Sequence, residues 1–141
     1  MQRVWIAPRP VRYALVVGCA VAILYASVVD PTGGAPGEGV SRTLPGAGGT
    51  AHLHLLAYAA LAALVAHARL AADRRTLAVA VAFATLFGAG IELLQGALPY
   101  RTMAASDVVL NAVGAAAGAA GWRVLAASFG VARTVDAERS E

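Results

Sequence analysis

The sequence predicts an all-α integral membrane protein: a bundle of four transmembrane helices with both termini in the cytoplasm. Three observations lead to this fold class. Hydrophobic residues make up 59% of the 141 residues and charged residues only 13%, against about 45–50% and about 25% in soluble domains. Four apolar runs reach the roughly 20 residues that a bilayer-spanning helix needs. None of them alternates with the period of two that is typical of a membrane β-barrel strand. A freely soluble enzyme and a disordered chain are therefore excluded.

The four apolar runs are the predicted helices. They cover residues 13–29, 53–72, 77–98 and 108–129. The first holds no charged residue, whereas the third is interrupted by Glu92 and Gln95 and the fourth carries Asn111 and Arg123. A basic start followed by an apolar stretch is also typical of a signal peptide, but residues 13–29 are long for that role.

Between the helices, the composition predicts one long connection and two short ones. Residues 30–50 are rich in Gly and Pro, which indicates a flexible loop on the outer face. Residues 69–76 form a short basic turn, and residues 99–106 form a second short turn that opens with a proline. The membrane domain then covers residues 13–129, between a cytoplasmic N-terminus at 1–12 and a cytoplasmic tail at 130–141.

The distribution of arginine predicts the orientation in the membrane. All eleven basic residues are arginine, and nine of them lie before the first run, between the second and third, or near the C-terminal end. Only Arg42 and Arg101 lie in the two remaining connections. Since positively charged segments stay in the cytoplasm, both termini are expected there.

Several chemistries are not expected from this sequence. Cys19 is the only cysteine, so it forms no internal disulfide and no cysteine-based metal cluster. The arginines form no patch with aromatic residues between them, which argues against a nucleic-acid partner. The histidines have no convincing metal-ligand spacing with a carboxylate, although His54 and Glu92 could meet in space. No phosphate-binding or nucleophile motif occurs, and we expect neither a metal nor a cofactor.

Polar residues in the membrane-spanning runs point to one candidate site. An ionisable side chain in hydrocarbon costs roughly 2.5–3.5 kcal/mol on insertion scales, so it needs a compensating role. With the predicted topology, seven polar residues fall near the outer leaflet, at one depth. They are His54, Tyr58, Glu92, Gln95, Arg101, Asp107 and Asn111. Their shared depth predicts that they converge on a single site.

The first functional hypothesis is a site that binds or modifies an amphiphile of the outer leaflet. The catalytic candidates are Glu92, Asp107 and His54, and the binding candidates are Arg101, Gln95, Tyr58 and Asn111. Glu92 would be the buried acid or base, with Asp107 and His54 orienting it or relaying a proton. Arg101 would hold a phosphate or carboxylate, and the neutral side chains would supply hydrogen bonds. The expected partners are membrane lipids or a lipid-linked envelope precursor.

Each of these residues also has a structural explanation. Glu92 could be a protonated acid that holds the bundle together through Gln95 or Tyr58. Asp107 could be the N-cap of the fourth helix. Head-group anchoring or hydrogen bonding between helices would explain the others, namely Arg101, Asn111, His54 and Tyr58.

These structural roles lead to a second hypothesis, a non-enzymatic protein that assembles with a membrane partner. Gly114, Gly118 and Gly121 would then serve close packing of the fourth helix, inside the chain rather than in a dimer. A transporter or proton pathway is the third hypothesis. It is disfavoured because no acidic residue marks the inner half of the first three helices.

In this order and spacing, the polar residues resemble the VanZ-like family of small membrane proteins. The resemblance rests on His54-x-x-x-Tyr58, Gly88-x-x-x-Glu92-x-x-Gln95, Pro99-x-Arg101 and Asp107-x-x-x-Asn111-x-x-Gly114. It covers about residues 50–120. One departure is that Thr50 and Ala51 stand where the family often has an Asp-Lys pair.

The resemblance implies a multi-pass protein of the cell membrane and a cell-envelope context. The family's namesake is associated with low-level resistance to the glycopeptide antibiotic teicoplanin. The resemblance therefore implies antibiotic resistance as a phenotype to test, and it implies no defined reaction.

Overall fold

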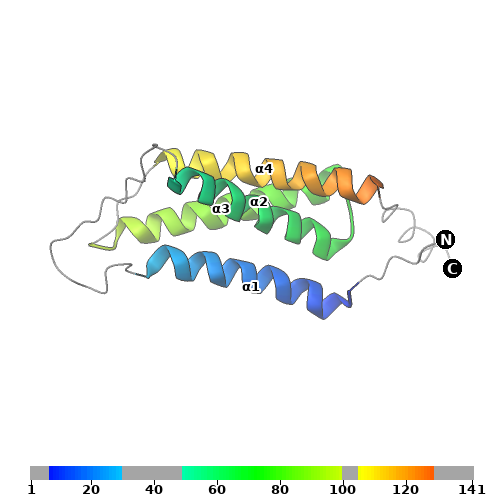
Figure 1. Cartoon of the computed structure of the whole chain (residues 1–141), viewed down its shortest axis with the longest axis horizontal. Coiled ribbons are helices and arrows are strands. Elements are labelled where there is room, and N and C mark those ends of the chain that lie inside the picture. Colours follow the sequence, from blue (N-terminus) through cyan, green and yellow to red (C-terminus); the bar gives the residue numbers. More distant parts are fainter. Residues whose placement is uncertain (1–6, 30–48, 100–104, 129–141) are drawn as a thin grey trace.

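The computed structural model describes residues 7–29, 49–99 and 105–128. Within these ranges the chain forms four helices and no strand: α1 (Arg9–Val28), α2 (Gly49–Arg69), α3 (Arg74–Gly96) and α4 (Ala105–Ser128) (Figure 1). The predicted all-α bundle of four helices is confirmed. Residues 30–48 of the expected outer loop, the N-terminal segment before residue 7, the tail and Arg101 lie outside the described residues. Residues 49 and 50, which were expected in that loop, belong to α2.

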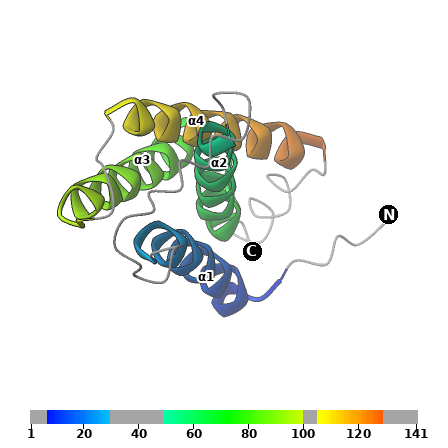
Figure 2. The same cartoon turned by 60° about the vertical axis from the view of Figure 1, so that its left-hand side comes forward.

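Consecutive helices run in opposite directions, and α2 lies in the middle of the bundle (Figures 1 and 2). It packs most extensively against α4 and also contacts α3 and α1. Helix α1 lies to one side, against α2 and α3. This topology places the end of α1, the start of α2, the end of α3 and the start of α4 at one end of the molecule.

Each helix begins three or four residues before the apolar run that predicted it. The reason is that hydropathy marks the apolar part of a helix, whereas the first turn extends into polar residues at the interface. At α1, Pro8 precedes the helix and Pro10 occupies its first turn, where a missing N–H costs nothing. At α3, the Asp73 side chain accepts hydrogen bonds from the backbone N–H (3.0 Å) and the hydroxyl (2.6 Å) of Thr76.

The turn between α2 and α3 is held by side chains from the other two helices. Leu70 follows α2 in the left-handed conformation, with φ of 49°, and so reverses the chain direction. The Arg12 guanidinium of α1 donates to the carbonyl of Ala68 at 2.9 Å. The Trp122 indole of α4 donates to the carbonyl of Ala71 at 3.0 Å. All four helices are therefore tied together at the end opposite the polar residues.

The interior of the bundle is built mainly from small residues, and the large apolar side chains face outward. Leu56, Leu86 and Leu93 are each about two-thirds or more exposed. The residues buried in the interior include five alanines whose exposed fraction is zero, namely Ala62, Ala66, Ala80, Ala84 and Ala115. Helices that associate within lipid typically place large apolar residues outside and small residues inside.

Three helices, α1, α3 and α4, are long and apolar enough to cross a membrane. Four such segments were predicted, and α2 is not among those found in the part of the chain that the structure describes. The described part of α2 carries His52, His54, His67 and Tyr58 among its apolar residues. Helix α2 is also the most enclosed of the four, since it contacts all three others. A central helix faces protein more than lipid and can carry more polar residues.

Two glycines let α2 and α4 approach closely. A Cβ on Gly114 would lie 2.5 Å from the carbonyl oxygen of Leu55, and a Cβ on Gly118 would overlap the carbonyl of Ala59. The predicted packing role inside the chain is thus confirmed for Gly114 and Gly118. It is not confirmed for Gly121, where a Cβ would have no neighbour within 4 Å among the described residues.

Candidate functional site

Six of the seven residues predicted for the site lie at one end of the bundle, on three helices. They are His54 and Tyr58 on α2, Glu92 and Gln95 on α3, and Asp107 and Asn111 on α4. Four of them are buried, with exposed fractions of 2% for Tyr58, 1% for Glu92, 8% for Gln95 and 0% for Asn111. The seventh, Arg101, lies outside the described residues. We call these six residues the polar cluster.

His54 is the centre of the polar cluster. Its Nδ1 lies 3.0 Å from Oδ1 of Asn111, and its Nε2 lies 3.6 Å from Oδ2 of Asp107. An amide oxygen can only accept, so this arrangement places the ring proton on Nδ1. Nε2 faces the Asp107 carboxylate across 3.6 Å, a distance that is too long for a hydrogen bond.

Glu92 approaches the same histidine from α3. One ligand atom each of His54, Glu92 and Asp107 lies within 4.8 Å of the others. One acid on each of two helices and an imidazole on the third therefore meet in a small volume. The side chains of His54 and Asp107 are 21% and 28% exposed, so this volume remains open on one side.

Asp107 does not have the local role predicted for it. Helix α4 already includes Ala105 and Ser106, so Asp107 lies inside the first turn and is not the N-cap. The helix begins earlier than its apolar run. The carboxylate still lies in the first turn of the helix. What links Asp107 to the site is the contact of 3.6 Å between its Oδ2 and Nε2 of His54.

Gln95 and Tyr58 extend the polar cluster towards α1. The Gln95 side chain donates to the carbonyl of Ser27 at 3.0 Å, which ties the end of α3 to the end of α1. The Tyr58 ring stacks on the His54 ring, with centroids 6.2 Å apart. Gly88 makes room for this ring, because a Cβ there would lie 2.8 Å from it and 2.6 Å from Nδ2 of Asn111.

A pocket of about 410 Å³ opens beside the polar cluster, between α1, α2 and α3. Its α1 wall consists of Cys19, Ala22, Ile23, Ala26 and Ser27. From the other helices it is lined by Leu53, His54, Ala57, Tyr58 and Gln95. The volume is within the range of small-molecule sites. One wall is apolar and the opposite wall carries three side chains of the polar cluster, so the pocket is amphipathic.

The contribution of α1 to this pocket was not predicted. Cys19, Ile23 and Ala26 recur at intervals of four and three residues, and Ser27 is the only hydroxyl residue in the helix apart from tyrosines. That spacing is a signal for one helix face. It is weak in a run of uniformly apolar residues, where every face looks alike.

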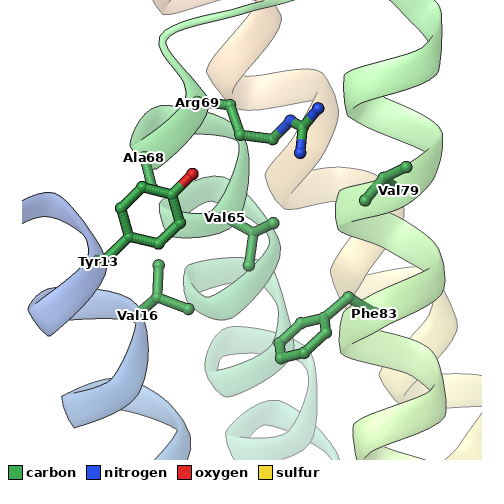
Figure 3. Close-up of a pocket in the computed structure, with 7 residues that line it drawn as sticks. All are labelled: Tyr13, Val16, Val65, Ala68, Arg69, Val79 and Phe83. Carbon is green, nitrogen blue, oxygen red and sulfur yellow. The ribbon is translucent and has the colours of Figure 1, made fainter. Parts of the chain in front are cut away.

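A second, smaller pocket lies near the opposite end of the same helices. It has a volume of about 250 Å³, and its apolar wall is formed by Val16, Val65 and Phe83 from three helices (Figure 3). Arg69 and Tyr13 also line it. It contains no member of the polar cluster, so the two pockets differ in chemistry although both lie against α1.

These features define a helical membrane protein that has a buried polar cluster beside a lateral pocket. The family model described as VanZ/LLP1 matches residues 26–126, which include α2, α3 and most of α4. The chain belongs to this family, as its resemblance over residues 50–120 predicted. No curated protein and no solved structure gives a significant match.

Proposed function

We propose that this VanZ/LLP1-family protein is a multi-pass protein of the cell membrane whose polar cluster binds or modifies an amphiphile of the cell envelope. The amphiphile would be a lipid or a lipid-linked molecule. The observation that carries the proposal is the amphipathic pocket, in which apolar residues of α1 face His54, Tyr58 and Gln95. An acyl or prenyl chain matches the apolar wall, and a polar head group matches the opposite one.

The position of the pocket along the bundle supports a ligand in the outer leaflet. All six arginines within the described residues lie at or near the end of the bundle that is opposite the polar cluster. They are Arg9, Arg12, Arg69, Arg74, Arg75 and Arg123. By the positive-inside rule that end faces the cytoplasm. The polar cluster then lies towards the outer leaflet, with both termini on the cytoplasmic side.

The chemistry proposed for the site follows from burial. Glu92 is 1% exposed and is the group best placed to act as a general acid or base, because it lies near His54 and Asp107. His54 is shared between the polar cluster and the pocket wall. A head group that enters the pocket would therefore meet His54 first, and Glu92 would act behind it.

A second candidate function is assembly with a membrane protein partner, in which the polar cluster serves only to hold the helices. Two hydrogen bonds favour it: His54 to Asn111 links α2 and α4, and Gln95 to Ser27 links α3 and α1. Under this function the pocket would need no ligand. The two candidate functions predict different outcomes when a substitution fills the pocket.

The test is native mass spectrometry of the protein released from its own membrane. Ala22→Phe fills the pocket from α1, and Val21→Phe places the same ring on the neighbouring residue, which is 58% exposed and does not line the pocket. We expect a defined lipid or lipid-linked adduct on the wild type and on Val21→Phe, and its loss from Ala22→Phe. The same nonspecific lipids on all three proteins would contradict the proposal.

Glu92→Gln separates binding from chemistry. It keeps the size of the side chain and removes its charge and acidity, so the variant should fold and retain the adduct while losing the cellular phenotype. Teicoplanin resistance is the phenotype that we propose to assay, in a host that lacks its own family member. A fully active Glu92→Gln variant would favour the assembly function instead.

A further inference from the structure

The three ionisable groups of the polar cluster have the arrangement of metal ligands. His54, Glu92 and Asp107 come from three different helices, and one possible ligand atom of each lies within 4.8 Å of the other two. None of them is on the exposed surface, since Glu92 is buried and the other two are partly buried. The sequence predicted that these three residues converge, but it showed no metal-ligand spacing, because no two of them lie on the same helix.

The orientation of His54 suits a ligand. A histidine that binds a metal through one ring nitrogen usually donates its other N–H to a carbonyl or carboxylate, which fixes the ring and its tautomer. The contact of 3.0 Å from Nδ1 to Oδ1 of Asn111 supplies that second partner. It leaves Nε2 directed at the Asp107 carboxylate, 3.6 Å away.

The distances also suit ligands of a shared ion. Nε2 of His54 and Oδ2 of Asp107 are 3.6 Å apart. Two ligands of one tetrahedral ion, each at about 2.0–2.1 Å from it, lie about 3.3–3.4 Å apart. All separations among the three ligand atoms lie within 4.8 Å, so binding of one ion requires the three side chains to draw together.

Charge gives a further argument. Two ionised carboxylates and a neutral imidazole carry a charge of −2, which a divalent cation balances. An ion that binds both carboxylates would offset the cost of their charge within the membrane.

We propose that His54, Glu92 and Asp107 bind one divalent first-row transition metal ion, with Zn²⁺ and Mn²⁺ as the best matches. An imidazole with two carboxylates suits these ions better than Cu⁺, which prefers sulfur ligands, or Ca²⁺, which prefers oxygen alone. Three protein ligands leave a coordination position open, as in catalytic metal sites. Because His54 also lines the pocket, an anionic head-group oxygen bound there would take that position. This last step rests on the proposed function.

The metal site is tested on the full chain in detergent micelles, after removal of bound ions with a chelator. Co²⁺ serves as a visible probe, because its absorption reports tetrahedral nitrogen and oxygen ligands, and elemental analysis counts Zn²⁺ bound after dialysis. Asp107→Asn and Glu92→Gln remove one ligand charge each. Asp73→Asn makes the same chemical change at an exposed carboxylate at the other end of the bundle, and is the matched control.

We expect the wild type and Asp73→Asn to bind one ion each. Asp107→Asn and Glu92→Gln should bind Co²⁺ about tenfold more weakly or worse. Zn²⁺ should raise the melting temperature of the wild type and of Asp73→Asn only. A helical circular dichroism spectrum should show that all four proteins fold. A folded wild type without stoichiometric metal, or ligand variants that bind as well as the wild type, would overturn the proposal. His54 and Asp107 would then be a plain contact between α2 and α4.

The metal site and the proposed function can fail separately. If no metal binds but the lipid adduct still depends on Ala22, the proposed function remains and the metal inference is lost. If metal binds at His54, Glu92 and Asp107 but no adduct is found on any protein, the metal site stands and the proposed amphiphile binding is contradicted.

Discussion

The His54 ring of α2 and the Asn111 amide of α4 face each other across 3.0 Å, from residues 57 positions apart in the sequence. This contact fixes the direction of the imidazole, because Nδ1 is held by Asn111 and Nε2 is turned towards Asp107. Asn111 is fully buried. It therefore positions the central residue of the polar cluster without reaching the pocket itself.

Loss of this amide should affect both stability and the site. Asn111→Leu keeps the volume of the side chain but leaves Nδ1 of His54 without its partner, which should cost about 1 kcal/mol in the free energy of unfolding. If the metal site exists, Co²⁺ affinity should also fall about 10–100-fold. Unfolding in mixed micelles and Co²⁺ titration measure the two effects. Ser128→Ala, which removes an exposed hydroxyl near the end of α4, should change neither.

The contact between α2 and α4 predicts opposite effects for two glycines of α4. Gly118→Ala forces a methyl group against the Ala59 carbonyl, and overpacking of this kind costs about 1–3 kcal/mol. Gly121→Ala has open space and should be neutral or stabilising by up to about 1 kcal/mol, because alanine favours the helix. Thermal unfolding of the two variants in one detergent compares them directly. Equal melting temperatures would contradict the packing described for α2 and α4.

Helix α1 should loosen when Gln95 is replaced. Gln95→Leu removes the hydrogen bond to the Ser27 carbonyl, at a cost of about 1 kcal/mol, and should increase proteolysis or hydrogen exchange at the end of α1. Thr85→Val is the matched control on the same helix. The Thr85 hydroxyl is buried and makes no hydrogen bond with the described residues, so its removal should be neutral or slightly stabilising. Unchanged exchange in Gln95→Leu would argue against the link between α3 and α1.

The start of α3 should depend on pH through Asp73. Hydrogen bonds from Thr76 lower the pKa of the Asp73 carboxyl from its ordinary value of 3.8. A lowered pKa means that this cap stabilises the folded state fully above the unfolded value. The stabilisation is lost as the pH falls through the lower folded value. The melting temperature of Asp73→Ala should therefore lie below that of the wild type at neutral pH, and the difference should shrink only below about pH 4. A difference that already shrinks between pH 7 and pH 5 would point to another group.

Much of this protein could be predicted from residue type and spacing. The apolar runs predicted four helices, and the three residues of the Gly88-x-x-x-Glu92-x-x-Gln95 motif are all buried on α3. Asp107 was placed wrongly as an N-cap, because the first turn of α4 contains Ala105 and Ser106, which hydropathy does not mark as helical. The α1 wall of the pocket was missed, since the spacing of Cys19 and Ile23 does not stand out in an apolar helix.

The sequence by itself determined the class of the protein, because helix-length apolar runs with isolated polar residues have few solutions other than a bundle in a membrane. Tertiary structure alone decided which polar groups meet. His54, Glu92 and Asp107 lie on three helices, and whether their side chains approach within 4.8 Å depends on how each helix is rotated and how closely α4 approaches α2. That rotation and approach are set by the packing of Gly114 and Gly118 against the α2 backbone. Such packing between two helices produces no periodic pattern in the sequence of either helix.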